Sequence, residues 1–132
     1  MENLSKTIVR LAEASGSDLS QSIGCAVDIT AGKAELGNTF GVITEAYDGG
    51  VAVAVFGGNA GAVEVKLSDS VAMGGTLKFD ATDGKASAAV AADGDFAQAI
   101  ALEAGVADEL VSAVLLPPSQ QAAMSALYTA KA

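Results

Sequence analysis

The stretch that decides the fold runs from Val63 to Pro117 and reads VEVKLSDSVAMGGTLKFDATDGKASAAVAADGDFAQAIALEAGVADELVSAVLLP. Short segments of alternating apolar and polar residues are interrupted, about every ten residues, by Asp-Gly or Gly-Gly. Alternation with a period of two is typical of a strand with one buried face. Glycine supplies the positive φ that tight turns require. The stretch therefore predicts an all-β domain, a small antiparallel sandwich or barrel.

Individual strands can be placed from this alternation. Clear strands are expected at residues 51–55, 63–67, 77–80, 96–102 and 110–116, and weaker ones at 25–30 and 40–46. In 96–102 the larger side chains lie opposite three alanines, which implies a close approach of two sheets or a face buried against another subunit. Residues 110–116 are almost continuously apolar, as expected for a strand buried on both faces. No internal repeat is evident.

Composition limits the size of the core. The chain has 132 residues, enough for one domain, and 51% are hydrophobic, but alanine supplies much of that share. Aromatic residues make up only 5%, with four Phe, two Tyr and no Trp. The core must therefore be thin, and thin cores in small domains are often helped by oligomerisation or by a partner surface.

The net charge of −9, from 16 acidic against seven basic residues, limits the choice of partners. The basic residues are scattered, and phosphate backbones are bound by clustered Lys and Arg. We therefore expect neither nucleic acid nor an anionic membrane as a partner. The acidic charge favours solubility, and it would also match a basic patch on a partner protein.

The N-terminal sequence and the cysteine content bear on location. The N-terminus lacks a basic start followed by a long apolar core, so we expect no signal peptide. No window is apolar enough to span a bilayer. Cys25 is the single cysteine, which excludes an intrachain disulfide, and its apolar surroundings predict a buried thiol. These features predict a reducing cytoplasm, or a particle assembled there.

The sequence offers little catalytic chemistry. The absence of histidine excludes Ser-His-Asp and Cys-His triads and all histidine metal sites. Paired carboxylates remain, namely Asp93 with Asp95 and Asp108 with Glu109, and both pairs sit in loop-like contexts that predict solvated turns. We therefore expect no enzymatic activity, no cofactor and no metal.

Two glycine-containing segments suggest binding sites but fit turns better. The segment 80–85, DATDGK, lacks the ligands of a helix–loop–helix calcium site, so a turn between strands is expected. Gly57, Gly58 and Asn59 open a glycine-rich segment with no following lysine, which does not fit a phosphate-binding loop. We interpret it as a loop that contacts a partner.

Three parts of the chain differ in pattern: an N-terminal arm (1–22), a β domain (23–117) and a C-terminal tail (118–132). In the arm, Leu4, Ile8 and Leu11 follow helical spacing and predict a short amphipathic helix. A helix this short needs a surface to lie on. We expect the arm to dock on a partner through these three residues, and the alternative is that it folds back on its own domain.

The β domain resembles the decoration, or cement, proteins of tailed-bacteriophage heads. The resemblance covers roughly residues 23–117 and rests on a pattern of turns and strands. The matching residues are Val65, Leu67, Val71, Gly74, Leu77, Phe79, Asp80, Gly84 and Lys85, then the segments 41–47, 99–104 and 111–116.

The resemblance implies a non-enzymatic structural role. Such proteins bind the outer surface of the capsid, often as homotrimers, and bridge neighbouring major capsid subunits. It therefore implies the major capsid protein as partner and the exterior of the virion, assembled in the host cytoplasm, as location. A second reading is a spike, tail or adhesin module that binds a host-surface glycan or protein. The scarcity of aromatic residues disfavours a glycan.

Overall fold

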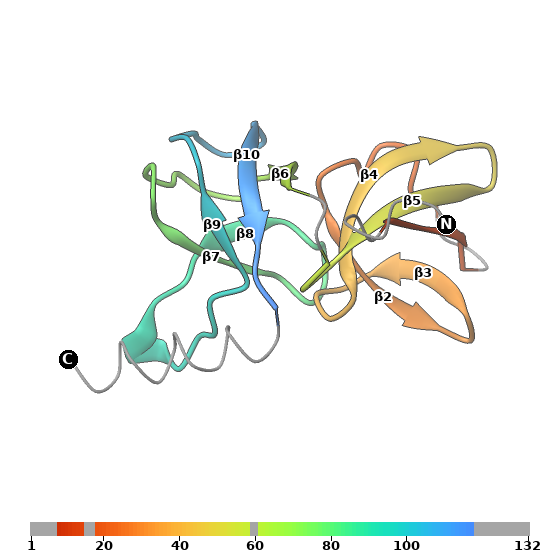
Figure 1. The fold of residues 1–132 in the computed structure, drawn as a ribbon, viewed down its shortest axis with the longest axis horizontal. Coiled ribbons are helices and arrows are strands. Elements are labelled where there is room, and N and C mark those ends of the chain that lie inside the picture. The colour runs from red at the N-terminus through yellow and green to blue at the C-terminus, as the bar shows by residue number, and fades with distance from the viewer. Residues whose placement is uncertain (1–7, 15–17, 59–60, 118–132) are drawn as a thin grey trace.

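The protein is an all-β structure in which two five-stranded antiparallel sheets lie side by side (Figure 1). The computed structural model describes residues 8–14, 18–58 and 61–117. Within these residues the chain forms ten strands and one short 3₁₀ turn, Ala91–Asp93. The expectation of an all-β antiparallel fold without long helices is confirmed for this part of the chain.

Each sheet is built from five consecutive strands. Sheet A has the order β1-β5-β4-β2-β3, with bounds Ile8–Ala12, Gly50–Val55, Gly41–Tyr47, Ala26–Thr30 and Lys33–Leu36. Sheet B has the order β6-β10-β9-β7-β8, with bounds Ala62–Lys66, Leu110–Leu115, Ala99–Ala101, Thr76–Phe79 and Ala86–Ala88. The second half of the chain therefore repeats the strand order of the first.

The two sheets also close in the same way. A parallel bridge joins the first and last strands of each sheet, Glu13 to Ala34 in sheet A and Leu67 to Ala86 in sheet B. The residue after each bridge donates its N–H to the same partner: Ala14 N lies 2.9 Å from Ala34 O, and Ser68 N lies 2.8 Å from Ala86 O. Each sheet thus curls into a small, nearly closed barrel, and the fold contains an internal repeat that was not predicted from the sequence.

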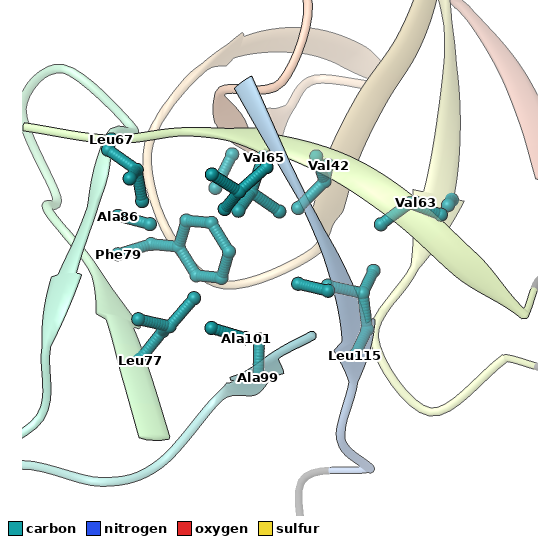
Figure 2. Close-up of a cluster of buried hydrophobic side chains, with 14 of the residues drawn as sticks. Val42, Val63, Val65, Leu67, Leu77, Phe79, Ala86, Ala99, Ala101 and Leu115 are labelled. Atoms are coloured by element: carbon teal, nitrogen blue, oxygen red, sulfur yellow. The ribbon is translucent and has the colours of Figure 1, made fainter. Parts of the chain in front are cut away.

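The larger cluster of buried side chains belongs to both sheets. Its members from sheet B surround Phe79, and Figure 2 shows that ring directed inward among Val65, Leu77 and Ala101. Sheet A and its end contribute Ala26, Val42, Ala54 and Phe56 to the same cluster. Because the two sheets bury apolar side chains against each other, they share this hydrophobic core.

A second cluster lies on the other face of sheet A. Successive residues of a strand point to opposite faces, so Val27, Ile43 and Val53 face away from sheet B while their neighbours face it. Most residues of β5 are buried as a result. The predicted segregation of Val and Ala to opposite faces of residues 51–55 is confirmed, since Val51 and Val53 are in the second cluster and Ala54 is in the shared one.

The predicted helical turn is wrong for residues 8–12, which form β1. This strand pairs with β5 in the register Ile8↔Ala54 to Ala12↔Gly50. Ile8 and Leu11 are three residues apart, so a strand places them on opposite faces. Leu11 is half-buried against the second cluster, whereas 48% of Ile8 is exposed. The described part of the predicted arm therefore follows the second alternative and folds onto its own domain.

Backbone groups join the two sheets directly. Ala26 N donates to Gly84 O at 2.8 Å, and Lys66 N donates to Gly24 O at 2.9 Å. Gly84 has φ +71°, and a Cβ atom added there would lie 2.3 Å from the Ala26 carbonyl oxygen. Only glycine fits this approach, because the obstacle is backbone and not a side chain that can move.

Two glycine-to-alanine substitutions test this junction. Gly32→Ala places a Cβ at a similar φ of +78° but in open space, so it should cost only about 1 kcal/mol of unfolding free energy. Gly84→Ala adds the clash with Ala26 and should cost on the order of 2 kcal/mol more. Urea unfolding of the two variants measures the difference, and equal losses would show that the sheets can separate at Gly84 without penalty.

Candidate partner-binding surface

The residues predicted to contact a partner do not form one cluster. Leu4 and Asn59 lie outside the described residues. Gly57 and Gly58 form a turn after β5, in which Gly57 has φ +82° and Gly58 N donates to Val55 O at 2.9 Å. Leu11 packs against the core of sheet A, and the exposed residues among the described members of this set are Ile8 and Gly57. A partner contact by these residues stays a prediction.

The segment around β9 directs its large side chains outward. Ala97, Ala99 and Ala101 are buried, whereas 57% of Phe96 is exposed and Leu102 is exposed as well. The alternation predicted for residues 96–102 is present, and the alanine face is the one that packs inside. Of the two explanations offered for that face, close packing in the protein's own core applies.

The expectation that residues 110–116 are buried on both faces is wrong for β10 in the single chain. Val111, Ala113 and Leu115 face the core, but 42% of Leu110 and 38% of Val114 remain exposed on the outer face. The reason is that β10 belongs to one curled sheet, and no described element of the chain covers its outside.

These outward side chains lie next to one another. Val114 pairs with Ile100 of β9 on one side and with Ala62 of β6 on the other. Leu102 N donates to Ser112 O at 2.8 Å, which places Leu102 beside β10. An apolar row therefore crosses three neighbouring strands of sheet B.

The row continues onto sheet A. Ile8 and Ile23 line a hollow together with Ala62 and Glu64. Ile23 also lines a second hollow together with Leu110. We call the resulting surface the outer apolar band, made up of Ile8, Ile23, Ile100, Leu102, Leu110 and Val114.

The sequence contained one signal for this band. Large apolar residues opposite alanines, followed by a continuous apolar strand, indicated two apolar faces on neighbouring strands. Periodicity alone does not say which of two faces points inward. The band was therefore not identifiable before the fold was known.

An open pocket of about 430 Å³ lies between the two sheets, separate from the band. Three of the four phenylalanines line it, Phe56 and Phe79 as its floor and Phe96 as an exposed rim. Its amide side chains hold the sheets together, since Gln98 Nε2 donates to Asn38 O at 2.8 Å and Asn38 Nδ2 donates to Phe79 O at 3.1 Å.

Three of the four carboxylates in the predicted pairs, those of Asp95, Asp108 and Glu109, form hydrogen bonds or ion pairs within the protein. Asp95 accepts the N–H of Val90 and forms an ion pair with Lys78 at 3.1 Å. The hydrogen bond from Val90 lowers the pKa of Asp95, so this carboxyl is ionised at neutral pH. Asp108 pairs with Lys85 at 3.2 Å and thereby raises the pKa of that lysine.

Glu109 and Asp80 accept hydrogen bonds from backbone N–H groups close to them in sequence. Glu109 accepts the N–H of Val106 at 2.9 Å. The predicted turn at residues 80–85 is confirmed, with Asp80 Oδ1 accepting the N–H of Thr82 at 2.7 Å. Burial raises the pKa of the Cys25 thiol.

Among the described residues, no three Asp, Glu or Cys side chains gather as metal ligands, and no helix is long and apolar enough to cross a membrane.

Comparison with known proteins adds no family assignment. None of the protein-family models matches the chain, and no curated protein matches it significantly.

Asp28 holds the loop that carries two residues of the pocket. Its Oδ1 accepts the N–H groups of Asn38 and Thr39, both at 2.8 Å, and the Thr39 hydroxyl at 2.7 Å. Burial of Asp28 opposes ionisation, but these hydrogen bonds outweigh it and lower the pKa of the carboxyl below its ordinary value. The loop is therefore fixed by an ionised aspartate.

This arrangement predicts an acid-sensitive contribution to stability. Because the folded-state pKa of Asp28 is lowered, its contribution is present above the unfolded pKa of about 3.9 and is lost as pH falls through the folded value. Asp28→Asn should reduce the unfolding free energy at pH 7 by about 1 kcal/mol, since bonds to a charged acceptor are stronger. The unfolding free energy of this variant should also fall less steeply between pH 4 and pH 2 than that of the wild type, as measured by urea unfolding. An acid slope equal to that of the wild type would contradict the role of Asp28.

Proposed function

We propose that the protein is a non-enzymatic capsid decoration protein, which binds the outer surface of a phage head and stabilises the shell by bridging major capsid subunits. The observation that carries the proposal is the outer apolar band of a small acidic β domain. Large aliphatic side chains face outward over neighbouring strands, while alanines of β9 and β10 face the core. A contiguous apolar surface of this kind is typical of a protein that works in an assembly.

The turn and strand pattern supports the same proposal. Among the residues that carry the resemblance to phage-head decoration proteins, Val65, Leu77 and Phe79 are buried. The turn at Asp80–Lys85 joins β7 and β8. Part of the pattern on which the resemblance rests therefore lies in the core of sheet B.

The physical mechanism of such a protein is linkage. A ligand that binds only the mature shell stabilises that shell by mass action. Many identical contacts, repeated over the surface, would then oppose the pressure of packaged DNA. The proposed location is the capsid exterior, with assembly in the host cytoplasm, and the proposed partners are the major capsid protein and further copies of this chain, as a homotrimer.

The proposed contacts with the capsid are the N-terminal residues before Ile8 and the turn at Gly57. Ile8 is exposed at the start of β1, and Gly57 is exposed in the turn after β5. Both lie outside the shared core, so a capsid surface can contact them without disturbing the packing between the sheets.

A second candidate function is a spike, tail or adhesin module that binds a host-surface glycan or protein. The pocket favours it, because Phe96 presents an exposed ring at the rim of a hollow between the two sheets. Concave sites at such junctions, with apolar walls and a few polar groups, are common ligand sites.

Co-sedimentation tests the two candidates against each other. The probe is phage heads assembled from a major capsid protein without any decoration protein. Wild-type protein should pellet with these heads and saturate their surface. The variant Phe96→Ala should pellet equally well, whereas deletion of residues 1–7 should weaken pelleting several-fold without lowering thermal stability.

The opposite result favours the second candidate. If the protein stays in the supernatant at saturating concentrations of heads, the decoration function is wrong. If a glycan array then gives a signal that Phe96→Ala abolishes, the pocket is a binding site and the protein is a host-binding module.

A further inference from the structure

The outer face of sheet B has the sequence of a buried surface but is open in the single chain. A continuous apolar run such as residues 110–116 is typical of a strand covered on both sides. In β10 the core covers only the face that carries Val111 and Ala113. The face that carries Leu110 and Val114 lacks a cover from the described residues.

The exposed side chains differ from the single apolar residues that any protein surface carries. Val114 lies in register with Ile100, and Ile8 and Ile23 line one hollow beside β6. Ala62 of β6 connects the two pairs, because it lies in register with Val114 and lines the same hollow as Ile8 and Ile23. Contiguity over both sheets, and not exposure alone, marks an interaction surface.

Charge separates this surface from the rest of the molecule. The charged residues among or against the band are Arg10, which is exposed on the same face of β1 as Ile8, Glu64 and Lys66 on β6, Asp108 paired with Lys85, and Glu103, which accepts the N–H of Ser112 at 2.9 Å. These three acids and three bases cancel, so the net charge of −9 comes from the remainder of the chain. The band is therefore nearly neutral in an acidic protein.

Near-neutrality indicates which partner covers the band. A basic partner would be matched by an acidic rim, and the acidic charge lies elsewhere on the chain. Two copies of this chain repel each other everywhere except through a face without much charge. Residues close to a symmetry axis of any order lie next to their own copies, so an apolar patch there must tolerate itself, and Glu64 and Lys66 place one acid and one base two residues apart beside it.

We propose that the outer apolar band is the self-association surface of the protein, placed at the symmetry axis of a homo-oligomer and covered by the same band of neighbouring copies. The proposal deepens the oligomeric part of the proposed function by naming its interface. It requires no capsid, because the partner is a second copy of this chain.

Sedimentation of the full chain tests the interface. At concentrations around 100 µM the wild type should sediment as an oligomer, whose mass gives the number of copies. Val114→Glu places one acid per copy at the axis and should raise the dissociation constant at least about 100-fold, to give a monomer. Leu102→Glu, on the neighbouring segment, should do the same and serves if Val114→Glu fails to fold.

The matched control is Ile29→Glu, which adds the same charge to an exposed aliphatic position in the β2–β3 hairpin. It should remain oligomeric. Raising the NaCl concentration from about 50 to 500 mM should strengthen wild-type association, because salt screens the repulsion between acidic copies.

Three results would overturn the proposal: a wild-type monomer at 100 µM, oligomers of both band variants, or dissociation of Ile29→Glu together with them. Each is read in solution, without heads. A failure of self-association is thus distinguishable from a failure of capsid binding in the co-sedimentation experiment.

Discussion

The close approach of two backbones at Gly84 and Ala26 is the contact on which the rest of the structure depends. Each sheet alone is a five-stranded curl with little interior. The hydrogen bond from Ala26 N to Gly84 O, at 2.8 Å, holds sheet A against the β7–β8 turn of sheet B. Val42 and Ala54 can then complete the cluster around Phe79. A protein with few aromatic residues thereby enlarges the core of sheet B with side chains from sheet A.

Alanine on the inner faces is the chemical counterpart of this contact. Ala99 and Ala101, which lie near the Phe79 ring in Figure 2, and Ala113 of the same cluster let neighbouring strands pack closely. Because the space inside the curled sheet is small, the larger residues of the same strands, such as Ile100 and Val114, point outward. The thin core and the outer apolar band are therefore two results of one packing solution, and the band requires a cover that the core cannot supply.

The sequence predicted the turns and most strands, which depend on residues close together in the chain. It did not predict the features that tertiary contacts determine. Turn chemistry located the β4–β5 and β7–β8 hairpins, and two-residue alternation located most strands. Residues 8–12 fit a helix or a strand equally well, and the free edge of β5 selected the strand. The repeat was missed because the two halves keep chiefly the hairpin motif, Asp28-x-Thr-x-Gly-Lys-Ala and Asp80-x-Thr-x-Gly-Lys-Ala, while their core residues differ.

The uneven charge distribution connects the two proposals. If copies meet through the nearly neutral band, the exposed acidic residues outside the band stay on the outside of the oligomer. Assembly then multiplies this charge and presents several copies of each exposed terminus and turn to one partner. Contacts that are weak for a single copy become strong when they bind together, because the later ones form at high effective concentration. Self-association through the band would thus supply the binding strength that a decoration protein needs, without any single large docking surface on the monomer.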